Sequence, residues 1–464
     1  MPLLLRHRLS ETLPIPAREI AMHHDKNTKP IQLHSPRPHT EGSTMKDTTL
    51  EMVPTGIEGL DDILKGGFPR NCLCVISGAP GAGKTTLAMQ FLIHGAARGE
   101  RCLYVTLSET RSEIEKVARS HEWDLAPIRI KELAPSGRNL STSAQLTVFN
   151  PSELELGETT EAMIEAVNEF RPHRVVLDSL SELRLVAHNS LRYRRQVLAL
   201  KHFFAGHDCT VLLLDDQSGG REDDHLQSIA HGVVVLEQLV NQYGAERRRV
   251  RIAKMRAVAF RGGFHEFVIR RGGLDVFPRL VAAEHVGEFN ELDTTSGHAA
   301  LDRLLGGGVP AGTSTLMVGP AGTGKSTVAT QFAVATAARG DRAAMFVFDE
   351  NIATFRSRSR KLGLPVEPAV EHGLITVQQV DPAELSSGEF AAIVRRAATG
   401  TDGSGGVAKT IVIDSLNGYL NAMPEEKYLT AQLHELLAYL GQQGVVTILT
   451  VTQSGMVGST PSPV

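Results

Sequence analysis

Short apolar runs alternate with Gly-rich turns and amphipathic segments from residue 55 almost to the end of the chain. Several runs, among them residues 73–76, 175–177 and 411–413, contain no polar side chain, which is typical of strands buried on both faces. Strands of this kind that alternate with helices predict βαβ units. We therefore expect an α/β fold with mostly parallel sheets flanked by helices.

The first 50 residues lack this pattern. They contain scattered His, Pro and Ser without a helical or strand period, which is typical of a disordered leader, and Met45 is a candidate for the natural start. Arg6 interrupts the opening apolar residues too early for a signal peptide, and no run of about 18 apolar residues follows. We expect a cytoplasmic protein without a membrane segment.

The chain contains an internal repeat with a constant offset. The separation between Lys84 and Lys325 is the same as that between Glu109 and Glu350. Other positions related by it are Thr55, Gly56, Leu60, Asp61, Gly66 and Gly67 against Ser296, Gly297, Leu301, Asp302, Gly307 and Gly308. Because 464 residues are also too many for one ordinary core, we expect a leader at 1–50, a first domain at 51–283 and a second at 284–464, with a linker at its start.

A glycine-rich loop follows the first apolar strand of each repeat. Between a strand and a helix, glycines let successive N–H groups turn inward, and the helix N-terminus adds its positive end, so the loop can hold a triphosphate. A lysine would contact the β- and γ-phosphates, and the hydroxyl after it would take one Mg²⁺ position. The alternative, a glycine-rich turn without function, does not explain why both repeats match the phosphate-loop pattern at equivalent positions. We expect ATP to bind Gly78, Ala79, Pro80, Gly81, Ala82, Gly83, Lys84, Thr85 and Thr86, and also Gly319, Pro320, Ala321, Gly322, Thr323, Gly324, Lys325, Ser326 and Thr327.

Two apolar strands end in the dipeptide Asp-Ser, at Asp178 and Asp414. Because the carboxyl ends of parallel strands border the ligand crevice of an open α/β sheet, we expect Mg²⁺ to be held by Thr85 with Asp178, and by Ser326 with Asp414. The alternative is that each Asp caps the helix that follows.

ATP hydrolysis also needs a group that holds the attacking water in line. The strand after the first helix ends in Ser108-Glu109, and its repeat ends in Asp349-Glu350. We assign catalytic roles to Glu109, Asp349 and Glu350. The alternative is an exposed acidic strand end.

Residues 247–256 form a basic segment. Strand periodicity places Val250, Ile252, Lys254 and Arg256 on one face, so that Lys254 and Arg256 project together. Such a pair could act on the γ-phosphate of a neighbouring subunit, as trans-acting arginine fingers do. The alternative is a solvated hairpin edge whose charges prevent aggregation.

The composition argues against nucleic acid as a partner. The net charge of −4 and the aromatic content of 5% give neither the field nor the stacking surface of a nucleic-acid-binding protein. The four cysteines lack the paired spacing of a metal site and are expected to be buried thiols.

Together these residues resemble the KaiC family of tandem RecA-like ATPases. The resemblance covers about residues 50–460 and rests on residues 55–61, the two phosphate loops, the two acidic strand ends and residues 254–256. It implies stacked rings, usually hexamers, with ATP between subunits and phosphoryl transfer to water or to Ser/Thr side chains of the protein itself. It also favours the finger interpretation of Lys254 and Arg256.

The chain departs from the family pattern in two places. Ser108 and Asp349 stand where the family carries glutamates, which puts hydrolysis in the first domain in doubt. Too few residues follow the strand at 446–453 for a counterpart of Lys254 and Arg256 or of the phosphorylated segment, and Ser459 and Thr460 lack a matching context. The second domain is therefore expected to be C-terminally incomplete.

We expect an ATPase, with Ser/Thr autokinase activity as a further option, whose nucleotide state controls ring assembly and docking of an unknown signalling protein. Two alternatives stay open. One is a non-catalytic, nucleotide-gated scaffold, favoured by Ser108 and by the short second domain. The other, which the net charge disfavours, is a RecA-like DNA-dependent ATPase.

Overall fold

The structure is a computed structural model. It describes residues 50–133, 151–187, 189–216, 227–240, 244–289, 292–381, 383–403, 405–421 and 428–453. The predicted leader, apart from Leu50, and the residues Ser459 and Thr460 lie outside the described part of the chain.

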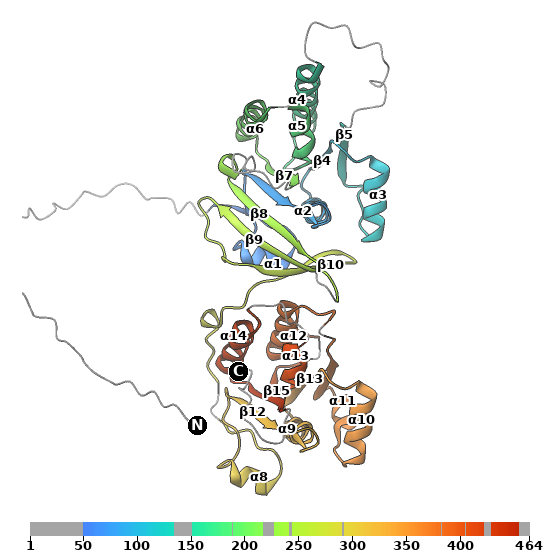
Figure 1. Cartoon of the computed structure of the whole chain (residues 1–464). Helices are drawn as coiled ribbons and strands as arrows, with labels where there is room; N and C mark the ends of the chain where they lie inside the picture. Colours follow the sequence, from blue (N-terminus) through green and yellow to red (C-terminus); the bar gives the residue numbers. More distant parts are fainter. Residues whose placement is uncertain are drawn as a thin grey trace, which may run out of the picture. The chain divides into compact units, whose positions relative to one another are not determined.

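The first repeat is built on a mostly parallel sheet (Figure 1). In the described residues this sheet has nine strands in the order β11-β10-β9-β8-β3-β7-β6-β4-β5. Pairs from β8 to β5 are parallel, and β9, β10 and β11 add an antiparallel meander next to β8. The strands are β3 (Leu73–Gly78), β4 (Cys102–Thr106), β5 (Ile128–Glu132), β6 (Arg174–Asp178), β7 (Thr210–Asp216), β8 (Gly232–Leu239), β9 (Arg247–Met255), β10 (His265–Arg270) and β11 (Gly273–Phe277).

Helices lie on both faces of this sheet. They are α1 (Glu58–Ile63), α2 (Lys84–Ala97), α3 (Arg111–Ser120), α4 (Pro151–Phe170), α5 (Leu180–Ala187) and α6 (Ser190–Ala205). A separate antiparallel pair joins β1 (Met52–Val53) to β2 (Phe68–Pro69).

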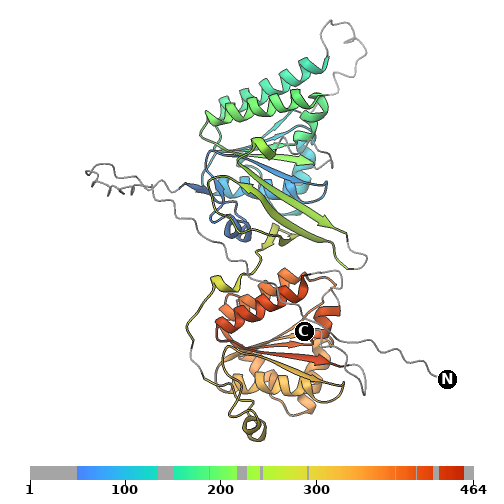
Figure 2. The same cartoon turned by 60° about the vertical axis from the view of Figure 1, so that its left-hand side comes forward.

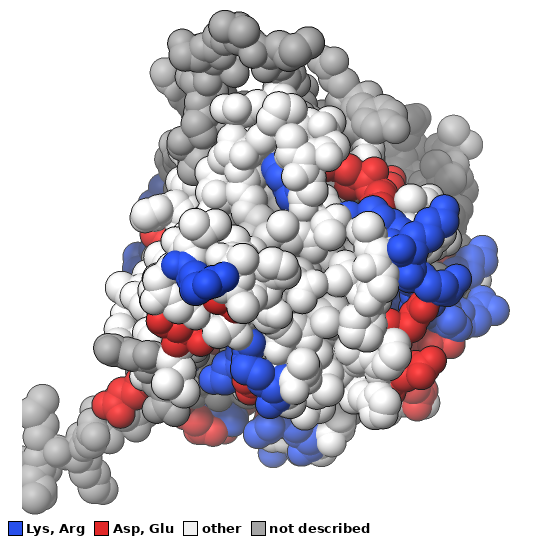
Figure 3. Space-filling model, turned by 90° about the horizontal axis from the view of Figure 1, so that it is seen from below, with Lys and Arg blue, Asp and Glu red and all other residues white. Residues whose placement is uncertain are grey.

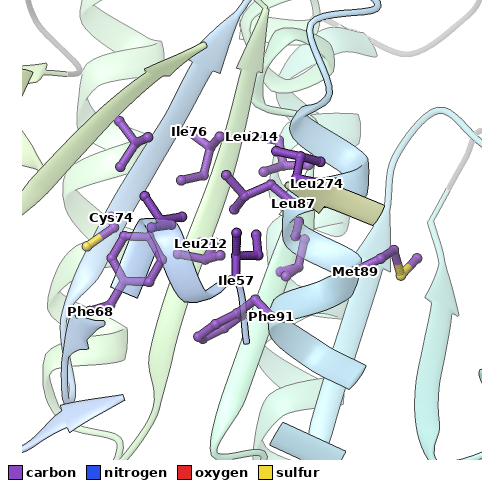
Figure 4. Packing of buried hydrophobic residues seen from close by; sticks show 14 of the residues in the cluster. Ile57, Phe68, Cys74, Ile76, Leu87, Met89, Phe91, Leu212, Leu214 and Leu274 are labelled. Carbon is purple, nitrogen blue, oxygen red and sulfur yellow. The ribbon is translucent and has the colours of Figure 1, made fainter. Parts of the chain in front are cut away.

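The strand β3 has no polar side chain between residues 73 and 76 because both of its faces are covered. Cys74 and Ile76 pack in the cluster that contains α2, whereas Leu73 and Val75 pack against α5 and α6 on the opposite face. Figure 4 shows the first cluster, with Phe91 of α2 among its members. Full burial of one such side chain contributes roughly 1.5–3 kcal/mol, so this alternation holds the strand before the phosphate loop rigidly in place.

The second repeat has a parallel sheet of its own (Figures 1 and 2). In the described residues its order is β12-β16-β15-β13-β14, formed by β12 (Ser314–Gly319), β13 (Arg342–Val347), β14 (Ile375–Gln379), β15 (Ala408–Asp414) and β16 (Val446–Thr452). One face packs on α9 (Lys325–Ala338) and α10 (Ile352–Lys361), and the other on α12 (Ser387–Thr399) and α14 (Leu429–Gln442). The remaining elements are η3 (Ala282–Glu284), α8 (Ala299–Leu304), α11 (Val366–Glu371) and α13 (Leu416–Asn421).

The order β12-β16-β15-β13-β14 repeats the order β3-β7-β6-β4-β5 strand for strand. The predicted fold class, tandem α/β domains with mostly parallel sheets, is therefore confirmed. The two sheets differ at the strand before the phosphate loop. In the first sheet β8 pairs with β3, whereas β12 is an edge strand of the described second sheet, with Leu316 and Val318 exposed.

The cysteine prediction is confirmed for three of the four thiols. Cys74, Cys102 and Cys209 are buried and Cys72 is half-buried, all as free thiols. Burial raises the pKa of the Cys102 thiol to about 12, which keeps this thiol protonated and unreactive.

Candidate nucleotide-binding sites

The first phosphate loop connects β3 to α2. Gly81 and Gly83 have φ angles of +79° and +100°, values that residues other than glycine rarely adopt. A Cβ on Gly78 would lie 2.5 Å from the carbonyl oxygen of Leu236, so close packing against β8 also requires glycine there. The loop therefore turns its backbone around the N-terminus of α2, as a phosphate cradle requires.

Lys84 is the first residue of α2 and its side chain folds back over the loop. Its buried Nζ donates to the carbonyl oxygens of Gly78 at 2.8 Å and Ala79 at 3.0 Å, and forms an ion pair with Asp216 at 2.6 Å. Burial raises the pKa of Asp216, but the hydrogen bonds from Lys84 and Ser181 outweigh this and hold that pKa below its usual range. The lysine is thus anchored beside the cradle by a carboxylate that would compete with a phosphate.

The second loop, between β12 and α9, has the same geometry. Gly322 and Gly324 have φ angles of +81° and +91°, and Lys325 Nζ donates to the carbonyl oxygens of Gly319 at 2.9 Å and Pro320 at 2.8 Å. A cavity of about 420 Å³ opens at this loop. Its wall is formed by Ala321, Gly322, Gly324, Lys325, Ser326, Thr327, Val347, Asp349, Glu350, Arg358, Asp414, Ser415 and Thr452. The structure thus brings residues of the second loop, the acidic strand end and the Asp-Ser strand to one cavity.

Asp178 lies at the end of β6, beside the first loop. Its Oδ2 accepts hydrogen bonds from Thr85 Oγ1 at 2.9 Å and from the Tyr104 hydroxyl at 2.6 Å. Burial raises the pKa of Asp178, and the hydrogen bonds from Tyr104 and Thr85 oppose that rise. The predicted pair Thr85 and Asp178 is therefore in direct contact, with a side chain arrangement that fits a magnesium site.

Tyr104 is a site residue that sequence reasoning missed. Burial and the adjacent Asp178 raise the pKa of Tyr104 well above its usual value, so its hydroxyl stays protonated and donates. The available signal was a single phenol among the apolar residues that precede Thr106 in β4. The second site differs here, because the carboxylate of Asp414 accepts instead from the hydroxyl of Thr450 on β16.

Glu109 follows the end of β4 and is half-buried. Its backbone exchanges two hydrogen bonds of 2.9 Å with Thr106 Oγ1, which fix the turn after the strand. Burial is the largest cause that raises the pKa of Glu109, followed by the negative charges of Asp178 and Glu113. Among the described residues its buried Oε2 has no hydrogen-bond partner.

The acidic pair of the second repeat is held by partners that Glu109 lacks in the described structure. Asp349 accepts a hydrogen bond from Ser415, and Glu350 forms an ion pair with Arg358 of α10. Burial and Asp414 raise the pKa of Glu350 above its usual value, and Arg358 opposes this. Sequence reasoning missed Arg358, whose signal was an arginine two helical turns after the strand end.

Lys254 and Arg256 come together, but not by simple strand alternation. In the pairing of β8 with β9, Ala253 is an extra residue between the paired positions Ile252 and Lys254. After this bulge the buried position is Met255, so the prediction that Lys254 and Arg256 share the face of Ile252 is wrong. Both side chains still contact the same stretch of backbone, at residues 227 and 228. Lys254 Nζ donates to the carbonyl oxygen of Gln227 at 2.6 Å, and Arg256 donates to that of Ser228 at 3.1 Å.

Surface charge is mixed on the face that Figure 3 shows, where Lys and Arg side chains lie among Asp, Glu and uncharged residues. Over the described part of the chain, no helix combines the length and the apolar character that a membrane crossing needs.

Comparison with known proteins agrees with this geometry. The family model described as "ATPase: KaiC" matches residues 53–281 and 294–461. The circadian clock oscillator protein KaiC of Synechococcus elongatus is 29% identical over 335 residues, which cover 70% of this chain and 62% of that protein. The corresponding protein of Parathermosynechococcus lividus is 26% identical over 339 residues, 70% of this chain and 60% of its own length. This chain thus matches about 60% of the length of these relatives. Since the family model covers most of the sequence in two tandem matches, the chain belongs to the KaiC family of ATPases.

Proposed function

We propose that the protein binds ATP with Mg²⁺ at both phosphate loops and hydrolyses it. The observation that carries this proposal is the repeated arrangement of a loop lysine, an Asp-Ser strand end and a Glu-bearing strand end on two separate sheets. It also favours domains at about 51–283 and 284–464, each with a site of its own.

The loop residues would bind the triphosphate. Positive φ angles at Gly81, Gly83, Gly322 and Gly324 allow each loop to turn backbone N–H groups toward phosphate oxygens. Lys84 and Lys325 already lie across their loops. Lys325 needs only to exchange its carbonyl contacts for β- and γ-phosphate contacts, whereas Lys84 must also give up its ion pair with Asp216.

The magnesium ion would be held by Thr85 and Asp178 in the first site and by Ser326 and Asp414 in the second. Direct contact of Thr85 with Asp178 supports the first assignment, and the shared cavity supports the second. When bound, Mg²⁺ would supply positive charge that stabilises the negative charge developing on the phosphates.

Glu109 and the pair Asp349-Glu350 would orient the attacking water. A half-buried carboxylate with a raised pKa and an oxygen unpaired in the described structure, as at Glu109, is suited to accept a proton from that water. Ser108 is exposed, so the residue next to Glu109 in the sequence supplies no second carboxylate, unlike Asp349 beside Glu350. Glu109 therefore supports hydrolysis in the first domain in spite of the departure at Ser108.

Ring assembly, with Lys254 and Arg256 acting on the nucleotide of a neighbouring subunit, remains part of the proposal. So do a hexameric state, phosphoryl transfer to a Ser or Thr of the chain, a cytoplasmic location and an unknown signalling partner. The convergence of Lys254 and Arg256 supports the finger role. The ion pair between Arg358 and Glu350 favours the second candidate, a scaffold whose second site binds ATP without turnover.

The test is a turnover assay with γ-labelled ATP on the purified chain and on Lys84→Ala and Lys325→Ala. Free phosphate is the expected product, and label retained on the protein would add the autokinase activity. Each variant should lose one bound nucleotide per chain. ATP binding without free phosphate or retained label would favour the scaffold, and unchanged nucleotide stoichiometry in both variants would remove the site assignment.

A further inference from the structure

The helices α3 and α10 occupy equivalent places after the acidic strand ends. Each begins behind a side chain that accepts a backbone hydrogen bond, Thr110 in one case and Asn351 in the other. Each also buries one large apolar residue at the same helical position, Ile114 or Phe355. Because the two helices share this register, the residue two turns after the catalytic glutamate takes the same place in both sites.

That residue is Val117 in the first repeat and Arg358 in the second. Arg358 forms an ion pair with Glu350, and the two side chains are 27% and 22% exposed, so solvent screens the contact only in part. The guanidinium also lies 5.6 Å from the centre of the Phe355 ring, which supports it from the helix side. A valine cannot make either charge-dependent contact.

Both members of the ion pair line the cavity at the second phosphate loop, together with Lys325, Ser326 and Asp414. The carboxylate that would receive a proton from water is therefore already engaged by a fixed positive charge. An engaged carboxylate is a weaker proton acceptor, because the ion pair must be given up as the proton arrives. Glu109 has no such hydrogen-bond partner for its buried Oε2 among the described residues.

We propose that Arg358 is a positioning residue that restrains Glu350, so that the second site turns ATP over more slowly than the first. The inference rests on the proposed function, since it assumes that Glu350 orients water. It makes Val117 and Arg358 the pair of residues that sets the two sites apart.

Arg358→Val tests the restraint in a Lys84→Ala background, where only the second site binds ATP. We expect nucleotide binding to persist and turnover to rise about two- to fivefold, which corresponds to about 0.4–1 kcal/mol at ~1.4 kcal/mol per tenfold change. Arg358→Lys keeps the charge and should stay closer to the parent. Arg356→Val, an exposed position on the same helix, is the matched control and should leave turnover unchanged.

The acidic limb of the pH–rate profile supplies a readout that a merely structural role would not move. Burial and Asp414 raise the pKa of Glu350, whereas Arg358 lowers it. The other charged groups that line the cavity are Lys325 and Asp349. Loss of the guanidinium should therefore move that limb to higher pH, because Glu350 then loses its proton at a higher pH.

The reciprocal variant Val117→Arg, in a Lys325→Ala background, should slow the first site by a similar factor. Unchanged or reduced turnover in Arg358→Val, with ATP still bound, would overturn the inference while leaving the proposed function standing. Absence of turnover at both sites of the parent chain would instead count against the proposed function itself.

Discussion

Lys84 and Asp216 form an ion pair with 2.6 Å between Nζ and Oδ1, and this contact has no equivalent among the described residues of the second repeat. Within their sheets, Asp216 pairs in register with Gly78, as Thr452 pairs with Gly319. A threonine thus stands where the first site has a carboxylate. The two phosphate lysines therefore differ in what a nucleotide must displace.

Asp216→Thr should tighten ATP binding at the first site. The carboxylate both occupies Lys84 and repels phosphate, and its side chain is 38% exposed, so the ion pair amounts to no more than about 1 kcal/mol, or roughly fivefold in Kd. Titration with ATP in a Lys325→Ala background measures this affinity. A weaker affinity would mean that Asp216 positions the lysine rather than competing for it.

Glu109→Gln should reduce turnover at the first site about 10²- to 10⁴-fold and leave ATP bound, because glutamine keeps the shape but cannot accept the proton. Ser108→Ala, an exposed neighbour, is the control and should change little. In the parent site, turnover should rise with pH through a pKa above the usual value for Glu, since burial, Asp178 and Glu113 raise the pKa of Glu109. An acidic limb at the ordinary glutamate pKa would speak against this residue as the base.

The same substitution should stabilise the fold at neutral pH. The pKa of Glu109 is higher in the folded than in the unfolded chain, so the folded state binds more protons and the free energy of unfolding decreases as pH rises through this window. A glutamine side chain at this position cannot ionise, and the substitution therefore removes that loss. Thermal unfolding of Glu109→Gln against the parent at pH 5 and pH 8 should show a larger gain in Tm at the higher pH; equal gains would contradict the cited pKa direction.

Tyr104→Phe should weaken the magnesium dependence of the first site. The phenol donates to Asp178 at 2.6 Å, and loss of a residue that orients a metal ligand commonly costs about tenfold or more in metal affinity. The Mg²⁺ concentration for half-maximal turnover should rise accordingly in a Lys325→Ala background. If that concentration stays the same, Thr85 alone is sufficient to orient the carboxylate.

Arg256→Ala should slow hydrolysis only in assembled particles if the finger role holds, since the residue would act on the neighbour's nucleotide. Arg251→Ala changes a charge on the same strand and serves as the control. Turnover measured above and below the assembly concentration separates the cases. An equal loss in isolated chains would show that Arg256 acts within its own domain.

The sequence by itself determined the repeat, the two phosphate loops, the Asp-Ser strand ends and the α/β class. These features depend on residues that are neighbours along the chain, where glycine conformations and strand-to-helix order follow from local chemistry. The two repeats, which share these motifs, also fold with the same strand order.

Only the tertiary structure decided which charges meet. Lys84 with Asp216 and Tyr104 with Asp178 come from different strands and helices, so these contacts depend on sheet register and helix position rather than on spacing. Glu350 lies between β13 and α10, and its contact with Arg358 depends on how α10 is placed after the strand. The bulge at Ala253 belongs to the same class, because an extra residue in a ladder is defined only by the partner strand. The motifs thus predict the chemistry of each site. The different side-chain contacts of the two sites arise only when the chain folds.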